Sequence, residues 1–273
     1  MRIAAADVDG QTRFGAIDGD RLVLAEDART PMDVGTAGGD SIPLAEARLV
    51  APIVPVRNVF CVGWNYVEHF EEGQTARGGT AQEIPDRPTF FTKATGTVIG
   101  PFDEIEGHGD VSETLDWEVE LAVVIGLGGR DISADRALEH VLGYTVANDV
   151  SARNVQRGHG GQWFRGKSLD RTCPIGPWIV TPDEFGIPAS QAIRCRVNAE
   201  VVQDASIADL HFDVPRIIEE LSRGLTLLAG DVILTGTPSG VGFARTPPRY
   251  LSVGDVVESE VEGIGTIRNV VAA

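Results

Sequence analysis

The sequence predicts a mainly β fold with a few helices, of the α+β class. Three observations indicate it: runs in which apolar and polar residues alternate recur along the 273 residues, glycine-containing turns separate many of these runs, and few segments carry helix signals. A hydrophobic content of 42% is ordinary for a globular protein and is enough to build a large core. We therefore expect a strand-rich globular chain in which helices play a minor part.

Residues 1–52 are expected to form a small β-rich domain. The runs RIAAADV, RFGAI and RLVLA are typical of short strands, and Asp-Gly pairs provide the turns between them. A glycine-rich stretch, DVGTAGGDS, follows, and Pro52 and Pro55 then indicate a boundary. Residues 53–273 are predicted to form the second, larger domain.

Two helices are predicted in the larger domain. The segment 133–143, SADRALEHVLG, begins with a serine in the N-cap position and ends with a glycine. The segment 213–224, DVPRIIEELSRG, carries stronger signals, because Asp213 can cap it, a proline stands in its first turn and its apolar residues share one face. GDVILTG and GDVVESEVEGIGTIRNVV return to strands joined by glycine turns, whereas residues 71–86 are polar and glycine-rich and are typical of a surface loop.

The acidic composition argues against several classes of partner. Forty acidic residues against 23 basic ones give a formal net charge of -17, which disfavours binding to nucleic acid or to an anionic membrane surface. The N-terminal residues form no apolar segment typical of a signal peptide, and no run approaches about 18 apolar residues, so we expect a cytoplasmic protein. Cys61, Cys173 and Cys195 are far apart without a CxxC pair, which favours buried reduced thiols over a disulfide framework or a zinc site.

Two carboxylates stand in a stretch that otherwise has the pattern of a core strand, LDWEVELAVVIG (115–126). Because side chains alternate along a strand, Glu118 and Glu120 point to the same face, roughly 6.5–7 Å apart along the chain, and can converge on one small object. Two like charges at this distance repel, and burying them costs several kcal/mol each unless a positive charge offsets it. Taken alone, the pattern also fits an edge strand with a solvated acidic face.

A third carboxylate follows another predicted strand, in the run YTVAND (144–149). Asp149 stands where that strand ends, a position at which ligand-binding groups are common. Together with the two glutamates it makes an all-oxygen set without histidine or cysteine, which favours Mg²⁺ or Mn²⁺ over zinc. Three side-chain ligands leave about half of an octahedral shell for water or a chelating substrate.

Residues 161–168, GQWFRGKS, match the phosphate-binding pattern G-x-x-x-x-G-K-S letter for letter. A phosphate-binding loop follows a buried strand and opens a helix, whereas here a polar segment precedes the match and a segment with two prolines follows it. Trp163 and Phe164 also place bulk where the backbone would have to approach a phosphate. We therefore reject nucleotide binding and keep Lys167 as a single cation in an aromatic turn, a position that also suits an ordinary surface lysine.

Residues 53–273 resemble the fumarylacetoacetate hydrolase family in several ordered motifs. These are GWNYVEHFEE (63–72), FFTKATGTVIGP (90–101), DWEVELAVVIG (116–126), YTVANDVSARNVQ (144–156), GKSLDRTCPIGP (166–177), LLAGDVILTGTPSGVG (227–242) and GDVVESEVEGIGTIRN (254–269). Their number and order make the resemblance more specific than any single motif. It implies a mixed β-sandwich roll packed with a few helices, preceded by the small N-terminal β-domain, and usually a homodimer.

The resemblance also assigns roles to individual side chains. In the family, the E-x-E strand and the aspartate of the D-x-[ST]-A-R motif hold a divalent cation, here Mg²⁺ or Mn²⁺, which implies that Glu118, Glu120 and Asp149 are metal ligands. This interpretation replaces the solvated acidic face. The resemblance further implies that Lys167 is an active-site lysine and that Arg153 and Gln156 contact the substrate. It also implies that Thr237 binds the substrate's carboxylate. Without the family, Arg153 and Gln156 could equally well form a polar face, with a spacing of three residues, and Thr237 could lie in a plain loop.

The segment GWNYVEHFEE resembles the start of the family's lid, which we expect over about residues 64–86. His69 and Glu72 match its catalytic dyad, and their spacing of three residues places imidazole and carboxylate on one side if the segment is helical. Glu72 would then orient His69 and raise its basicity, whereas a lone histidine in a polar segment is usually only solvated. Two departures from the family pattern, Asn154 in place of an aspartate and the residues flanking Lys93, caution against carrying over the substrate.

The resemblance implies an enzyme that acts on α-keto or diketo acids. A divalent ion with open positions can chelate such an acid and act as a Lewis acid when the neighbouring C–C bond breaks. If His69 and Glu72 activate water, the reaction is hydrolysis of an acylpyruvate or related 1,3-diketo acid, as in catabolism of aromatic compounds, and this is the predicted function. The same site also suits an oxaloacetate-type decarboxylase or a 2-hydroxyhepta-2,4-diene-1,7-dioate-type isomerase. A metal-binding protein without catalysis has no use for the dyad and the lysine together.

Overall fold

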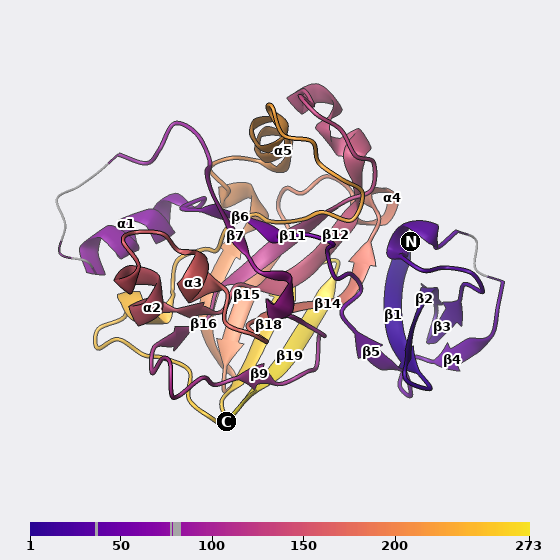
Figure 1. Ribbon diagram of the computed structural model, residues 1–273, viewed down its shortest axis with the longest axis horizontal. Helices are drawn as coiled ribbons and strands as arrows, with labels where there is room; N and C mark the ends of the chain where they lie inside the picture. The colour runs from indigo at the N-terminus through magenta and orange to yellow at the C-terminus, as the bar shows by residue number, and fades with distance from the viewer. Residues whose placement is uncertain (36–37, 77, 79–82) are drawn as a thin grey trace.

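The computed structural model describes residues 1–35, 38–76, 78 and 83–273, and its fold is mainly β with a few short helices, as predicted. Figure 1 shows strands of residues 53–273 at the centre of the molecule with most of the helices around them, and the N-terminal strands at the right. Within the described ranges, no helix is long and apolar enough to cross a membrane. The three cysteines are free and buried, as predicted.

Among the described residues, twelve strands form one large sheet. Ten of them follow a single path of neighbours: β4 (Ser41–Pro43), β3 (Arg21–Leu24), β2 (Gln11–Asp18), β1 (Arg2–Val8), β14 (Cys173–Val180), β12 (Val141–Asn148), β11 (Val119–Ile125), β17 (Val232–Leu234), β6 (Val59–Gly63) and β7 (Thr89–Lys93). Off this path, β5 (Arg48–Val50) pairs with β1, and β8 (Val98–Ile99) pairs with β14. Neighbours on the path are antiparallel except β17 and β6, which are parallel.

The N-terminal strands are continuous with this sheet. The strands predicted within residues 1–52 are present, and they have a small hydrophobic core of their own that includes Leu22 and Leu49. β1 also pairs with β14, with Arg2 opposite Val180 in the register. Main-chain hydrogen bonds therefore tie the N-terminal strands to the rest of the molecule, at the right of Figure 1.

A second sheet shares its core with the first, as in a β-sandwich. In spatial order its five strands, counted within the described ranges, are β16 (Glu200–Ser206), β15 (Ala192–Val197), β18 (Val256–Val261), β19 (Gly265–Ala272) and β9 (Ile105–Glu106). A further pair is formed by β10 (Leu115–Asp116) and β13 (Ser151–Ala152). The largest hydrophobic cluster joins Leu121 and Val146 of the large sheet to Ile193 and Ile267 of the second one.

β11, which carries one of the two glutamates, is a central strand with both faces buried. Leu121 and Val123 pack into the largest core, whereas Ala122 and Val124, on the opposite face, pack into a second hydrophobic cluster. β12 and β17 pair with its two edges. The alternative of an edge strand with a solvated acidic face is therefore wrong, because both edges of the strand are paired and both glutamates are buried.

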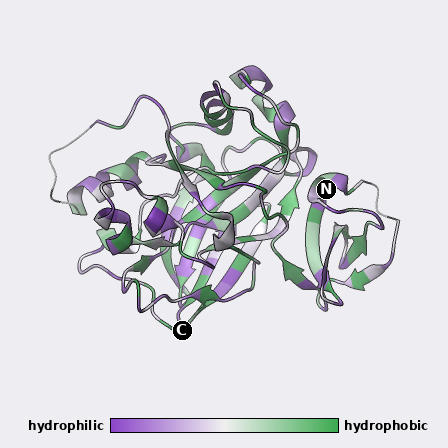
Figure 2. Cartoon of the chain, in the orientation of Figure 1, coloured by the Kyte–Doolittle hydropathy of each residue, from purple (hydrophilic) through white to green (hydrophobic). Residues whose placement is uncertain are grey.

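The helices are short and surround the sheets. The α-helices are α1 (Val67–Ala76), α2 (Arg153–Gly158), α3 (Phe164–Lys167), α4 (Pro182–Phe185) and α5 (Val214–Ser222), and the 3-10 helices are η1 (Pro31–Asp33), η2 (Thr95–Thr97), η3 (Ala134–His140), η4 (Ile207–Asp209) and η5 (Gly242–Ala244). Figure 1 shows α1, α2 and α3 gathered on one side of the molecule. In Figure 2 most of β1 is hydrophobic, whereas the helices carry both hydrophilic and hydrophobic residues.

One predicted helix is confirmed and the other is corrected. The helix predicted at 213–224 is α5, and the Oδ1 atom of Asp213 caps it by accepting a hydrogen bond of 2.9 Å from the N–H group of Arg216. The helix predicted at 133–143 is a 3-10 helix that ends earlier. The serine before it makes no capping hydrogen bond, and Val141 already belongs to β12, where pairing with β11 outweighs the local helix signals.

Within the described residues, the phosphate-binding pattern at 161–168 has neither the strand before it nor the long helix after it that such a loop needs. α2 precedes it, and the single turn of α3 lies inside it. A phosphate-binding loop requires a buried strand before the glycines and a full helix after them. The rejection of nucleotide binding at this segment therefore agrees with the structure.

Candidate active site

Three carboxylates form a buried triad beside β11. One ligand oxygen from each of Glu118, Glu120 and Asp149 lies within 4.8 Å of the others. Glu118 immediately precedes β11, Glu120 lies in it, and Asp149 follows the end of β12. Because β11 and β12 pair with Val119 opposite Asn148, the residues next to this pair lie side by side. The two strands therefore bring the three carboxylates together.

Hydrogen bonds fix the ends of these strands. The N–H group of Asp149 donates to the carbonyl oxygen of Glu118 at 2.8 Å, and the N–H group of Glu118 donates to Oδ1 of Asn148 at 2.9 Å. The Oε2 atom of Glu120 accepts a hydrogen bond of 2.6 Å from the N–H group of Gly236. The triad is thus held by backbone contacts as well as by the packing of its strands.

Three cations surround the triad. The Nζ atom of Lys167 lies 2.5 Å from Glu118 Oε2 and 2.6 Å from Asp149 Oδ2. Arg153 contacts Glu118 Oε1 through Nη2 at 2.6 Å, and the Nζ atom of Lys93 lies 2.9 Å from Asp149 Oδ1. Glu118 and Asp149 are therefore each paired with cations, whereas Glu120 has no ion-pair partner within the described part of the chain.

The buried charges leave one excess negative charge. Four buried carboxylates face three buried cations: Asp116, Glu118, Glu120 and Asp149 against Lys93, Arg153 and Lys167. Burial raises the pKa of Glu120 well above its ordinary value, and the neighbouring Asp149 and Glu118 raise it further. Burial alone would also raise the pKa of Glu118, but Lys167 and Arg153 lower it below its ordinary value. The excess negative charge is therefore concentrated at Glu120.

This donor set fits a hard divalent cation. Carboxylate oxygens are the ligands that Mg²⁺ and Mn²⁺ prefer, and the triad contains no histidine or thiolate that would favour a softer metal. A positive charge beside Glu120 would offset the excess negative charge. The residues present thus have the chemistry and the spacing of a site for one divalent ion, held by Glu118, Glu120 and Asp149.

Metal binding is expected to stabilise the folded protein. A ligand that binds only the native state stabilises it by about 2.7 kcal/mol when its concentration is about 100 times its Kd. We therefore expect the melting temperature to rise when Mg²⁺ or Mn²⁺ is added to protein stripped with EDTA, as measured by calorimetry. The same melting temperature with EDTA and with saturating metal would contradict the site.

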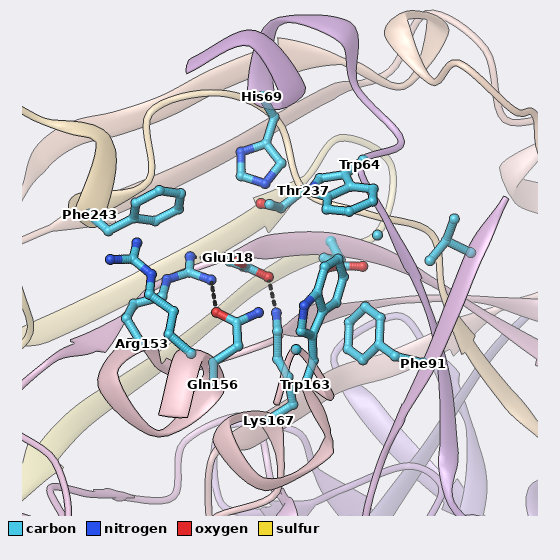
Figure 3. Close-up of a pocket in the computed structure, with 15 residues that line it drawn as sticks. Trp64, His69, Phe91, Glu118, Arg153, Gln156, Trp163, Lys167, Thr237 and Phe243 are labelled. Carbon is cyan, nitrogen blue, oxygen red and sulfur yellow. Dashed lines mark hydrogen bonds and ion pairs between the residues drawn. The ribbon is translucent and has the colours of Figure 1, made fainter. Parts of the chain in front are cut away.

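A histidine–glutamate pair on α1 lies above the triad. The Nδ1 atom of His69 is 2.9 Å from Oε1 of Glu72, and the other carboxylate oxygen of Glu72 accepts a hydrogen bond of 2.9 Å from the N–H group of Gly240. The helix thus places both side chains on one side, at the spacing expected from the sequence. With Nδ1 held by Glu72, the Nε2 atom of His69 is available to the cavity that the histidine lines. Figure 3 shows His69 at one end of this cavity, beside Thr237.

The described part of the predicted lid packs over the cavity. Besides the contact from Glu72, the hydroxyl of Ser239 donates to Oε2 of Glu68 at 3.1 Å, so α1 is attached to the loop that follows β17. The lid was predicted over about residues 64–86, and residues 77 and 79–82 of that range lie outside the described residues. Movement of this segment on substrate binding stays a prediction.

The cavity has a volume of about 330 Å³ and two aromatic walls. Figure 3 shows Trp64, Trp163 and Phe91 on one side and Phe243 on the other. The ring centroids of Trp64 and Trp163 are 4.9 Å apart. Trp64 has a φ of 58°, a conformation that residues other than glycine rarely adopt, and such strain persists only where surrounding contacts hold it. The packing of these rings therefore defines the shape of the cavity.

Polar side chains predicted to contact substrate line the same cavity. Arg153, Gln156 and Thr237 all face it, together with Lys167. The Oε1 atom of Gln156 accepts a hydrogen bond of 3.2 Å from Arg153 Nη1, and Nε2 of Gln203 donates to Thr237 Oγ1 at 2.8 Å. The structure thus gathers all the residues singled out from the sequence around one cavity, with Asp149 and Glu72 just behind its lining.

Sequence reasoning missed two buried charged residues at this site. Asp116 accepts hydrogen bonds from Arg153 Nε at 2.8 Å and from the N–H group of Gly242 at 2.6 Å, so it positions a pocket arginine and the η5 segment. The alternation that placed the two glutamates on one face also places Asp116 there, and could have identified it. Lys93 ends a strand, and no local signal indicates that its partner is Asp149, which is 56 residues later.

Replacing Lys93 by Met is expected to destabilise the protein. Removing one partner of a buried ion pair typically costs about 3–5 kcal/mol, and we expect about 3 kcal/mol here because Lys167 still neutralises Asp149. Urea unfolding in the presence of EDTA measures the loss, with Arg165→Met on the exposed side of α3 as the matched control. Equal unfolding midpoints for Lys93→Met and the control would show that the pair contributes no stability.

Comparison with known families gives two matches along the chain. Residues 58–272 match the family model described as fumarylacetoacetate (FAA) hydrolase, C-terminal. Residues 1–52 match the model described as Rv2993c-like, N-terminal.

Curated relatives match most of the chain. The oxaloacetate tautomerase YisK of Bacillus subtilis (strain 168) is 44% identical over 258 residues, which cover 92% of this chain and 83% of that protein. The mitochondrial oxaloacetate tautomerase FAHD2A of Homo sapiens is 44% identical over 229 residues, which cover 84% of this chain and 70% of that protein. These two proteins are named for keto–enol interconversion of oxaloacetate, not for hydrolysis.

Solved structures share the fold over the whole chain. A fumarylacetoacetate hydrolase from the psychrophile Exiguobacterium antarcticum is 43% identical, with a TM-score of 0.88 and coverage of 100% of this chain and 99% of that one. A 2-hydroxyhepta-2,4-diene-1,7-dioate isomerase from Mycobacterium marinum is 37% identical, with a TM-score of 0.82 and coverage of 100% and 98%. Proteins with this fold thus carry names of both hydrolases and isomerases.

Proposed function

Because this chain belongs to the fumarylacetoacetate hydrolase family, we propose that it is a divalent-metal-dependent tautomerase that interconverts the keto and enol forms of a short α-keto diacid of the oxaloacetate type. The observation that carries the proposal is the histidine–glutamate pair facing a buried carboxylate triad across a small cavity. The names of the relatives that match most of the chain support tautomerisation over the hydrolysis predicted from the sequence.

The triad end of the cavity is suited to the α-keto acid group. When bound to the triad, a divalent ion supplies a Lewis acid that polarises a carbonyl group. Burial would lower the pKa of Lys167, but Asp149 and Glu118 raise it above its usual value, so the side chain remains a cation and donates hydrogen bonds. Thr237 lies in the same cavity with its hydroxyl oriented by Gln203, and is placed to bind the substrate's carboxylate.

His69 is the group that moves the proton. In the keto form, the C3–H bond breaks, Nε2 of His69 accepts the proton, and the electron pair forms the C2–C3 double bond while the carbonyl oxygen takes up a proton from solvent. In the reverse direction His69 returns its proton to C3. Glu72 holds Nδ1 of the ring, which keeps Nε2 toward the cavity. Glu72 is itself held by Gly240, so the pair is preorganised.

Hydrolysis of a C–C bond in an acylpyruvate is the second candidate. The same pair favours it, because a histidine oriented by a carboxylate can deprotonate water as well as a carbon acid. The two reactions share the enolic form of an α-keto acid and differ in whether water attacks a second carbonyl group. Decarboxylation of a β-keto acid needs no base, and the oriented histidine therefore gives it no support.

A panel of three assays tests the proposal. The purified protein with Mg²⁺ or Mn²⁺ is given oxaloacetate and a set of acylpyruvates, and enol absorbance, pyruvate release and CO₂ release are followed in parallel. We expect the interconversion of enol and keto oxaloacetate to be accelerated well beyond the rate with metal alone. Pyruvate release from acylpyruvates without any effect on the oxaloacetate enol would reject the tautomerase and establish the second candidate.

A further inference from the structure

We propose that Arg157 is a specificity-determining residue, which binds the distal carboxylate of the substrate and so selects α-keto diacids over α-keto monoacids. The inference rests on the proposed function for the position of the α-keto acid group at the triad. No motif in the sequence singled out Arg157, and the proposed proton transfer does not use it.

The position of Arg157 on α2 directs it to the cavity. Arg153, Gln156 and Arg157 are related by steps of three and four residues, so they share one face of the helix. All three line the cavity, which also contains Glu118 and His69. Arg157 is exposed at the end of this row, whereas Arg153 is buried next to the triad. The row therefore leads from the metal-binding end of the cavity to its solvent side.

The two arginines on this face differ in their partners. Arg153 is engaged by Asp116 at 2.8 Å and by Glu118 at 2.6 Å, so its charge is already balanced. Arg157 has no carboxylate partner among the residues that the structure describes. In a chain with 40 acidic and 23 basic residues, an arginine in a cavity without such a partner is available to an anion from outside.

An aromatic ring orients the free guanidinium. The guanidinium carbon of Arg157 lies 5.0 Å from the centroid of the Phe243 ring, and that of Arg153 lies 4.6 Å from it. Stacking on an aromatic face restricts the side chain without using its hydrogen-bond donors. Arg157 is thus held at the wall of the cavity while its N–H groups stay free for a carboxylate, which an arginine can bind through two parallel hydrogen bonds.

The charge of the site also favours a dianion. The buried groups around the triad carry one excess negative charge, which a divalent ion would convert to one excess positive charge. Arg157 adds a positive charge at the solvent side of the cavity, while the carboxylate of Glu72 is held by His69 and Gly240 behind the lining. An α-keto diacid would place its second carboxylate against Arg157, whereas an α-keto monoacid would leave Arg157 without a partner.

Binding of two stable analogues tests this inference without turnover. Racemic malate keeps a carboxylate with an adjacent oxygen and has a distal carboxylate, whereas racemic lactate has a methyl group in place of the carboxymethyl group. Calorimetry with saturating Mg²⁺ gives the Kd of each for the unmodified protein, for Arg157→Ala and for Arg165→Ala. Arg165 is exposed on α3 and does not line the cavity, so its variant removes the same charge nearby.

We expect Arg157→Ala to weaken malate binding by roughly 10-fold or more, the loss of a hydrogen-bonded charge pair, and to leave lactate binding unchanged. Arg165→Ala should change neither, and Arg157→Lys should restore part of the malate affinity. Unchanged malate affinity in Arg157→Ala, or an equal loss for malate and lactate, would overturn the assignment. Failure of the protein to tautomerise oxaloacetate, with malate affinity still dependent on Arg157, would reject the proposed reaction and leave the recognition of a dianion in place.

Discussion

Replacing Glu120 by Gln is expected to weaken the binding of Mg²⁺ or Mn²⁺ by at least about 100-fold and to abolish metal-dependent activity. Residues that only support a metal ligand typically contribute 10- to 100-fold to affinity, so loss of a ligand charge should reach or exceed about 100-fold. The substitution keeps the shape of the side chain and can keep the hydrogen bond from Gly236. Titration calorimetry measures the affinity, and the oxaloacetate enol assay measures the activity.

The same substitution should have the opposite effect on stability without metal. Glu120 is buried among other carboxylates, and its raised pKa shows that its charge is unfavourable in the folded protein. In EDTA we therefore expect the urea midpoint for unfolding of Glu120→Gln to be equal to or higher than that of the unmodified protein. Asp231→Asn, which removes a buried carboxylate paired with Arg57 away from the cavity, is the matched control and should lose stability while keeping metal affinity. Unchanged metal affinity in Glu120→Gln would remove Glu120 from the ligand set.

Replacing His69 by Ala is expected to lower the rate of keto–enol interconversion by about 10²- to 10⁴-fold, the usual contribution of a positioned general base. The carboxylates of the triad do not contact His69 directly in the hydrogen-bond and ion-pair network of the described residues. Metal affinity should therefore stay within a few-fold of the unmodified value. Enol absorbance gives the rate, and calorimetry gives the metal affinity.

Two controls separate proton transfer from a change in the lid. His140→Ala removes a histidine that is bonded to Leu127 far from the cavity, and should retain full activity. The affinity of His69→Ala for oxalate reports whether α1 still covers the cavity, because a displaced helix would weaken oxalate binding as well. A His69→Ala variant that interconverts the two forms at the unmodified rate would show that another group moves the proton.

The carboxylate triad could be predicted because its determinants are local. Alternation along one strand places Glu118 and Glu120 on one face, and the end of a second strand places Asp149. The spacing of three residues in a helix does the same for His69 and Glu72. The cap of α5 was also visible, because Asp213 and its helix are adjacent in the sequence.

Other features depend on contacts between segments far apart in the chain. Pairing of β1 with β14 attaches the N-terminal strands to the large sheet, and nothing in residues 1–52 indicates which strand they join. From the sequence alone, Lys93 is only the polar end of a predicted strand, and its ion pair with Asp149 becomes evident only in the structure. The role proposed for Arg157 depends on stacking of its guanidinium on Phe243, which is 86 residues later in the chain. Long-range contacts of this kind have no signature in a single sequence.

The most direct test of the account is exchange at C3 of oxaloacetate in D₂O, followed by proton NMR. We compare the protein loaded with Mg²⁺, the same protein with EDTA, the Glu120→Gln variant with Mg²⁺, and Mg²⁺ alone. The account predicts that the loaded protein replaces the C3 protons with deuterium far faster than the other three samples and releases no pyruvate at a comparable rate. Exchange by the loaded protein no faster than Mg²⁺ alone would contradict the claim that the triad and His69 together enolise an α-keto diacid.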